Sequence, residues 1–137
     1  MMRLSLPILA LMLTSCAATP AQVARDQADT ARTQQRLDKR LAGFTPTGTN
    51  QCIRPVNAQV DIFGDTLVYS DSASRLHVTN TTGGCFGLKR DDIIVTRSFS
   101  SQFCSGDIVQ TVDRTNGFPS GACSFGEFVT YTRDRRR

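Results

Sequence analysis

The chain has 137 residues, of which 39% are hydrophobic and 20% are charged, with a formal net charge of +4. This length allows one folded domain and a tether. The positive charge is not evidence for nucleic-acid binding, because residues 51–131 carry six basic and eight acidic side chains. The basic surplus lies in residues 21–42 and in the tail 133–137. We interpret the tail as a solvated, disordered chain end, with weak attraction to anionic lipid headgroups or other envelope polyanions as the alternative.

The first fifteen residues have the three parts of an export signal. Met1–Arg3 is a short positive segment, Leu4–Leu13 is apolar, and the small residues Thr14 and Ser15 precede Cys16. An apolar run of ten residues is too short to cross a bilayer as a helix, which needs about 20 residues. The segment Leu13–Cys16 matches a lipobox, so we expect cleavage before Cys16 and acylation of that cysteine.

Two details bear on the destination of the exported chain. The alternative to a lipobox is ordinary secretion with cleavage after Ala18, which leaves Cys16 in the cleavage region without a role. Ala17 follows Cys16 where Asp is the usual signal for inner-membrane retention, so resemblance to other Gram-negative lipoproteins implies sorting to the outer membrane. We therefore expect an outer-membrane lipid anchor with the chain facing the periplasm.

A helix is predicted after the anchor. Thr19 suits a helix N-cap, Pro20 suits the first helical position, and Gln22 completes a capping box. Helix formers continue to Ala42, and Gly43 favours a helix end. The sequence thus predicts a helix over about residues 20–42.

The predicted helix has a thin stripe of partly apolar residues. Residues of this stripe recur every seven positions: Val23, Thr30, Leu37 and Phe44, with Gln27, Gln34 and Leu41 alongside. The stripe is too polar for a stable coiled coil. We expect a charged spacer that holds the domain away from the membrane and docks on it through Leu37 and Leu41, with a partner-binding helix as the alternative. Residues 43–50 are rich in turn formers and are predicted to be a linker, so that residues 16–50 form the tether.

From residue 51 onward the pattern favours strands. Seven are predicted, near residues 51–55, 58–63, 66–71, 75–80, 93–99, 107–113 and 125–132. Phe63–Thr66 is a two-residue hairpin turn between alternating runs, and Asn116-Gly117 followed by Pro119 marks a second turn. Leu76 and Val78 are expected to face inward and His77 outward. The predicted fold of residues 51–132 is all-β, a small antiparallel barrel or sandwich of six or seven strands.

The cysteine count supports both the anchor and an oxidising compartment. Assigning Cys16 to lipid leaves an even number in the β-domain, namely Cys52, Cys85, Cys104 and Cys123. Four cysteines in an exported chain imply two disulfides, and three pairings are open. We favour Cys52–Cys85 with Cys104–Cys123, because a chain that threads into the periplasm can oxidise its cysteines in order of arrival.

The β-domain resembles a group of small bacterial envelope proteins, many of them proteobacterial lipoproteins without an established activity. The likeness covers residues 50–132 and rests mainly on the placement of cysteines. Its segments are Cys52-Ile53, the hairpin Val60–Tyr69, Gly84–Leu88, Phe103–Asp107 and Cys123–Phe128. The resemblance implies a compact β-domain with two bridges and no catalytic residue to carry over.

No motif in the chain points to a reaction. His77 is the only histidine, so any serine or cysteine triad would have to use it, and no nucleophile-elbow sequence accompanies it. Glycosidase chemistry needs two carboxylates about 5–9 Å apart, and the candidates are Asp91, Asp92, Asp107 and Glu127. Neither EF-hand nor zinc-ligand spacing is present, and Asp91-Asp92 is a weak candidate calcium pair. We therefore expect no enzyme activity, no metal and no cofactor.

The sequence favours a non-catalytic accessory or binding module of the cell envelope, held on the membrane by acylated Cys16. An unknown envelope protein would be its partner, and an exposed edge strand or the loop 81–92 is the expected contact surface. Two alternatives stay open: a protein inhibitor of the periplasmic lysozyme-inhibitor type, similar in architecture only, and a hydrolase built on the four carboxylates.

Overall fold

The computed structural model describes residues 18–55 and 58–133 of the chain. The export signal 1–15, Cys16 and residues 134–137 lie outside the described residues. The described part begins with α1 (Pro20–Leu41), which is followed by nine strands and one short 3-10 helix, η1 (Phe86–Arg90). The strands are β1 (Thr45–Asn50), β2 (Cys52–Ile53), β3 (Gln59–Phe63), β4 (Thr66–Ser72), β5 (Arg75–Gly84), β6 (Ile93–Arg97), β7 (Phe103–Cys104), β8 (Ile108–Val112) and β9 (Pro119–Thr132).

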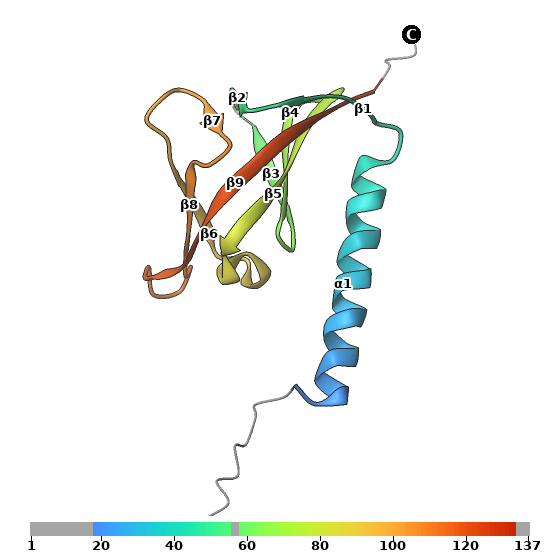
Figure 1. Ribbon diagram of the computed structural model, residues 1–137, viewed down its shortest axis with the longest axis vertical. Coiled ribbons are helices and arrows are strands. Elements are labelled where there is room, and N and C mark those ends of the chain that lie inside the picture. Colours follow the sequence, from blue (N-terminus) through green and yellow to red (C-terminus); the bar gives the residue numbers. More distant parts are fainter. Residues whose placement is uncertain (1–17, 56–57, 134–137) are drawn as a thin grey trace, which may run out of the picture.

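The main sheet is antiparallel and curls into a half-barrel, as the all-β prediction expected (Figure 1). Its order is β3-β4-β5-β9-β8-β6, and β1 pairs with the C-terminal part of β9 beside this path. The long strand β9 is the spine of the sheet, since β5 lies along one side of it while β1 and β8 share the other. A separate two-stranded ribbon joins β2 to β7.

The concave side of the sheet encloses an aromatic core. Tyr69 on β4 makes edge contacts with Phe103 and Phe125, and Phe125 packs on Phe128 of the same strand. The Thr96 side chain of β6 lies near the Tyr69 hydroxyl, so strands from the two arms of the sheet approach each other across the interior. Burial raises the pKa of Tyr69 well above its usual value, and the nearby Thr96 side chain partly opposes the rise.

Helix α1 covers the opposite face of β3, β4 and β5. Its N-terminus carries the predicted capping box, in which the Thr19 side chain accepts from the backbone N–H of Gln22. Leu37 and Leu41 pack against a second buried cluster around Phe63, as the stripe predicted, and the other buried members are Val68 and Leu76. The docked part of α1 is short, since Thr33 is its first partly buried residue and lies beside the β3–β4 turn at Gly64.

The two disulfides are Cys52–Cys104 and Cys85–Cys123, so the predicted pairing in order of arrival is wrong. Cys52 lies directly opposite Cys104 in the β2–β7 ribbon. Cys85 follows the end of β5, which pairs with β9 at Cys123. The topology of the sheet, and not the order of synthesis, therefore brings each pair of sulfurs together.

Two local predictions also differ from the structure. Residues 45–50 form β1 and not a linker, because the backbone of this turn-rich segment hydrogen-bonds to the edge of β9. His77 lies on the other face of β5 from Leu76 and Val78, but the prediction that it points outward is wrong: it pairs with Tyr69 on the concave side of the sheet, and its side chain is only 13% exposed. Both faces of β5 are covered, one by α1 and one by the curl of the sheet, and a simple in–out alternation does not anticipate this.

Candidate functional site

Large exposed apolar side chains gather on the convex side of β6 and β8. Ile93 and Val95 of β6 are 44% and 38% exposed, and Ile108 of β8 is 55% exposed. In the β6–β8 ladder Ile93 pairs with Val112 and Arg97 pairs with Ile108, so these side chains share one face. The alternate residues Ile94 and Val109 face the core.

The same face continues across β9 to Phe86. Residue pairing places Ala122 of β9 between Gln110 and Gly84, and none of these residues has a bulky apolar side chain that would cover the face. The Phe86 ring lies over Gly84 and is 75% exposed. We call the set of Phe86, Ile93, Val95 and Ile108 the outer apolar face. Phe118 and Phe99, also exposed, lie in the loops at its two ends.

The backbone of β6 is an open edge of the main sheet. β6 pairs with β8 on one side and with no strand of the described residues on the other. Unpaired edges commonly carry proline, an inner lysine or a β-bulge that discourages further pairing. β6 has no proline, no lysine and no bulge; its one charged residue, Arg97, is its last, and its ladder with β8 is regular over five residue pairs. The outer apolar face therefore adjoins a backbone able to bind another strand.

Charges of opposite sign mark the two ends of β6. Asp91 stands before the strand, and its carboxylate is 89% exposed. Its ion pair with Arg114, at 3.8 Å between exposed side chains, contributes little free energy. Arg97 ends the strand, is exposed, and makes no ion pair within residues 18–55 and 58–133.

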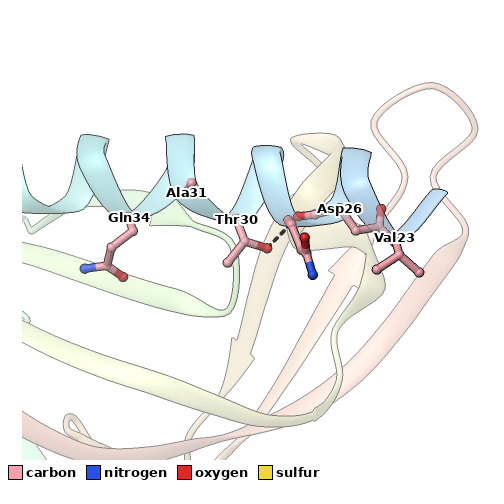
Figure 2. Close-up of a pocket in the computed structure, with 6 residues that line it drawn as sticks. Val23, Asp26, Thr30, Ala31 and Gln34 are labelled. Carbon is pink, nitrogen blue, oxygen red and sulfur yellow. Dashed lines mark hydrogen bonds between the residues drawn. The ribbon is translucent and has the colours of Figure 1, made fainter. Parts of the chain in front are cut away.

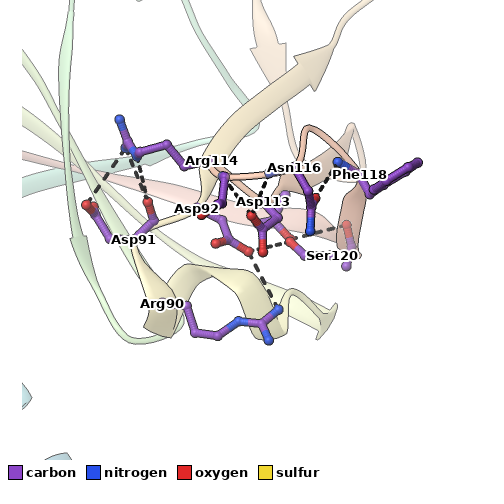
Figure 3. Close-up of polar contacts among 11 residues, drawn as sticks. Arg90, Asp91, Asp92, Asp113, Arg114, Asn116, Phe118 and Ser120 are labelled. Atoms are coloured by element: carbon purple, nitrogen blue, oxygen red, sulfur yellow. Dashed lines mark hydrogen bonds and ion pairs between the residues drawn. The ribbon is translucent and has the colours of Figure 1, made fainter.

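A polar network fixes the start of β6 and the loops beside it (Figure 3). Asp92 is only 6% exposed and accepts a hydrogen bond from the Ser120 hydroxyl at 2.5 Å, while Arg90 approaches the same carboxylate at 3.6 Å. Asp113 caps the β8–β9 turn by accepting from the backbone N–H groups of Thr115 and Asn116. Those backbone hydrogen bonds lower the pKa of Asp113.

Gly87 is required at the centre of this network. A Cβ at residue 87 would overlap the carboxylate of Asp92 and the hydroxyl of Ser120, and it would lie 2.6 Å from the hydroxyl of Thr111. The three polar side chains therefore close tightly around the backbone of η1. They hold Phe86, the preceding residue, in its place on the outer apolar face.

The four candidate carboxylates do not all come together in one place. Asp91 and Asp92 precede Ile93, whereas Asp107 precedes Ile108, and these strand starts lie at opposite ends of the β6–β8 ladder. Five strand residues span about 15 Å, which exceeds the separation used in glycoside hydrolysis. Asp107 accepts from the backbone N–H of Cys104, and Glu127 accepts from the side chain of Gln51.

Asp91 and Asp92 also separate as a candidate calcium pair. Asp92 turns to Ser120 and Arg90, whereas Asp91 turns to Arg114 (Figure 3). Among the residues that the structure describes, no group of three or more potential ligands could hold a metal ion.

His77 takes part in a chain of polar contacts across four strands. Its Nδ1 lies 3.0 Å from the Thr130 hydroxyl, which also accepts from the Asn50 amide at 2.8 Å. Its Nε2 lies 3.9 Å from Asp71, too far for a hydrogen bond, and Asp71 accepts instead from Arg75 Nε at 2.6 Å. Burial lowers the pKa of His77, and the nearby Asp71 carboxylate opposes the shift. The group links β1, β4, β5 and β9, and we assign it a structural role.

The first half of α1 carries a shallow hollow on its surface (Figure 2). Val23, Thr30 and Gln34 point to the same side of the helix, and Thr30 donates a hydrogen bond to the backbone oxygen of Asp26. Only residues of α1 line the hollow, so no other element helps to enclose a ligand there. Neither α1 nor η1 is long and apolar enough to cross a membrane, and the search covers the described residues only.

No family model, no curated protein and no solved structure matches the chain. Sequence reasoning expected an exposed edge strand or a loop over residues 81–92 as a contact surface; residues 81–84 instead belong to β5, and Phe86 begins η1 within that range. It missed Ile93, Val95 and Ile108, because both alternating faces of residues 93–95 are apolar and give no sign of which one is open.

Proposed function

We propose that the protein is a non-catalytic accessory or binding module of the bacterial cell envelope, and that it contacts a protein partner through the outer apolar face. The observation that carries this proposal is the coincidence of exposed apolar side chains with the bare edge of β6. A soluble domain that leaves Phe86, Ile93, Val95 and Ile108 open along an unprotected edge has the features of a protein-binding surface.

Several features support the envelope as the location. The sequence has a lipobox ending at Cys16, and the two disulfides favour an oxidising compartment. We therefore place the protein on the outer membrane, anchored by an acylated Cys16 and facing the periplasm. This assignment agrees with the resemblance to proteobacterial lipoproteins, which rests on the same cysteines.

Helix α1 separates the β-domain from the proposed anchor at Cys16. α1 begins four residues after Cys16, and its contact with the domain starts only at Thr33. Residues 20–32 extend beyond the β3–β4 turn (Figure 1) and, at 1.5 Å per residue, form a strut of about 20 Å. We interpret α1 as a spacer that keeps the β-domain clear of the lipid surface and its apolar face accessible.

The location is tested by producing the full-length chain in a Gram-negative host. Mass spectrometry of the membrane-bound protein should find a lipid on Cys16 and no free thiol at the other four cysteines. Cys16→Ala should release the protein from the membrane fraction. An unmodified Cys16 in a membrane-bound chain would contradict the anchor.

The contact surface is tested in the same cells with a photo-crosslinking amino acid. At position 86 it should give a reproducible protein adduct that position 60 does not give, since Val60 is 37% exposed but lies on β3 at the other end of the sheet. Equal adducts at both positions, or none at either, would contradict the proposed surface.

A further inference from the structure

We propose that the partner of the outer apolar face is a second copy of this chain, which pairs antiparallel with it along β6. The inference deepens the proposed function by naming the occupant of that face, and it rests on the face being a contact surface. The juxtaposition that points to it is an unprotected edge strand with apolar residues in the middle, an acid at one end and a base at the other.

The order of residues along β6 makes the strand complementary to itself. The segment reads Asp91-Asp92-Ile93-Ile94-Val95-Thr96-Arg97. When two copies run antiparallel with Ile94 opposite Ile94, Ile93 of each copy lies beside Val95 of the other on the outer face. The same register brings Arg97 of each copy to the end of β6 where the other copy carries Asp91.

The charges of the strand favour this occupant over an unrelated strand. Arg97 has no ion-pair partner among the described residues, and Asp91 has only a long, exposed contact with Arg114. A two-fold axis through Ile94 supplies both charges with a partner at once, at both ends of the interface. In a parallel arrangement with Ile94 beside Ile94, Asp91 would lie beside Asp91 and Arg97 beside Arg97, so the like charges would repel.

The other edges of the sheet carry features that discourage such pairing. β1 contains Pro46, and its ladder with β9 shifts register between Pro46 and Gly48. β3 lies against α1, and Asp61 on that strand forms an ion pair with Arg40 of the helix at 2.8 Å. β6 has neither device, so two-fold pairing through β6 closes the edge of the main sheet that lacks such protection.

The test uses the purified full-length chain, extracted from membranes in a mild detergent and studied by sedimentation equilibrium. We expect a monomer–dimer equilibrium that Val95→Lys weakens at least about tenfold, because two unpaired ammonium groups would enter an apolar contact. Val60→Lys is the matched control, with the same residue change at similar exposure on β3, and should leave the equilibrium unchanged. Circular dichroism checks that both variants fold.

The register is tested by mixing two variants that each carry one added cysteine besides those of the native disulfides. Ile93→Cys chains mixed with Val95→Cys chains should form cross-linked heterodimers under mild oxidation faster than either variant alone. Wild-type chains that stay monomeric at about 100 μM, or equal effects of Val95→Lys and Val60→Lys, would overturn the inference. If the cellular cross-links at position 86 then contain a different protein, the proposed function stands without the dimer; if they contain nothing, both fail.

Discussion

The two end strands of the main sheet, β3 and β6, are treated differently by the rest of the chain. On β3, Phe63 is 7% exposed because Leu37 and Leu41 of α1 pack over its cluster, and Arg36 lies over its ring at 5.6 Å. On β6, no described element covers the outer side chains Ile93 and Val95. Both strands have apolar residues on their outer faces, but only β3 has a helix placed against them.

The difference between β3 and β6 shows that a sheet of this size can have its end strand covered, so the exposure of β6 is not a consequence of the small size of the domain. The chain provides a 22-residue helix, and its docked part covers the face at β3, β4 and β5. It also provides a polar network that ties η1 and the start of β6 to β8 and β9. We infer that β6 is left open and held in shape because it is a binding edge.

Truncation of one apolar residue on each edge strand should separate the two regions most strongly. Phe63→Ala is expected to lower the free energy of unfolding by about 3–5 kcal/mol, because it leaves a cavity under α1. Ile93→Ala should cost about 1 kcal/mol in the monomer, since Ile93 is 44% exposed and fills no enclosed space. Urea denaturation at a protein concentration low enough to dissociate any dimer measures both values. Similar losses would contradict the contrast between the edges.

Removal of the buried disulfide should loosen the β6 side of the molecule. Cys85 and Cys123 are 4% and 7% exposed and join the end of β5 to β9 next to η1. Replacing both by alanine is expected to cost about 2–4 kcal/mol in equilibrium unfolding.

The control for that change is the double alanine variant of Cys52 and Cys104. This bridge closes a comparable sequence separation, 52 against 38 residues, but Cys52 is exposed and the bridge joins the two strands of the separate ribbon β2–β7, not strands of the main sheet. It should leave hydrogen exchange at η1 and β6 unchanged. If this variant speeds hydrogen exchange at β6 more than loss of the Cys85–Cys123 bridge does, the Cys85–Cys123 bridge is not what stabilises β6.

Ser120→Ala should disturb the start of β6 more mildly. The substitution removes the hydrogen bond to the buried Asp92 carboxylate, and the expected loss of stability is about 1–3 kcal/mol. Ser124→Ala on the same strand is the matched control, because its hydroxyl contacts only Thr82 at the surface and its loss should be nearly neutral. Equal losses of thermal stability in the two variants would contradict a structural role for the Asp92–Ser120 network.

The smallest expected effect is a dependence of the free energy of unfolding on pH, caused by His77 of β5. Burial lowers the folded-state pKa of His77 below its usual value of 6.5, so the unfolded chain binds a proton more readily than the folded chain. Stability should therefore fall as the pH drops through 6.5 toward the folded-state pKa, and level off below it. His77→Gln should remove this part of the slope when unfolding is followed between pH 7 and pH 5, and an unchanged slope would assign it to other groups.

The sequence was sufficient for features that local chemistry determines. Thr19, Pro20 and Gln22 specify the start of α1, and the glycine at position 64, with φ of +63°, allows the hairpin between β3 and β4. The all-β class followed from the spacing of short apolar runs.

Features that depend on long-range pairing were not predictable from the sequence. The disulfides join residues that meet only when β2 pairs with β7 and β5 pairs with β9. The turn-rich segment 45–50 becomes β1 only because β9 presents a free edge to it. The open side of β6 is determined by where α1 docks, and no pattern within residues 93–97 encodes that position.

The central claim, that β6 and not β3 is the binding edge, is tested most directly by hydrogen–deuterium exchange of the full-length chain at low and high protein concentration. Amides of residues 93–97 should exchange more slowly as the concentration rises, while those of residues 59–63 should exchange at a constant rate. A rate at β6 that does not depend on concentration, or equal slowing at both strands, would contradict the account.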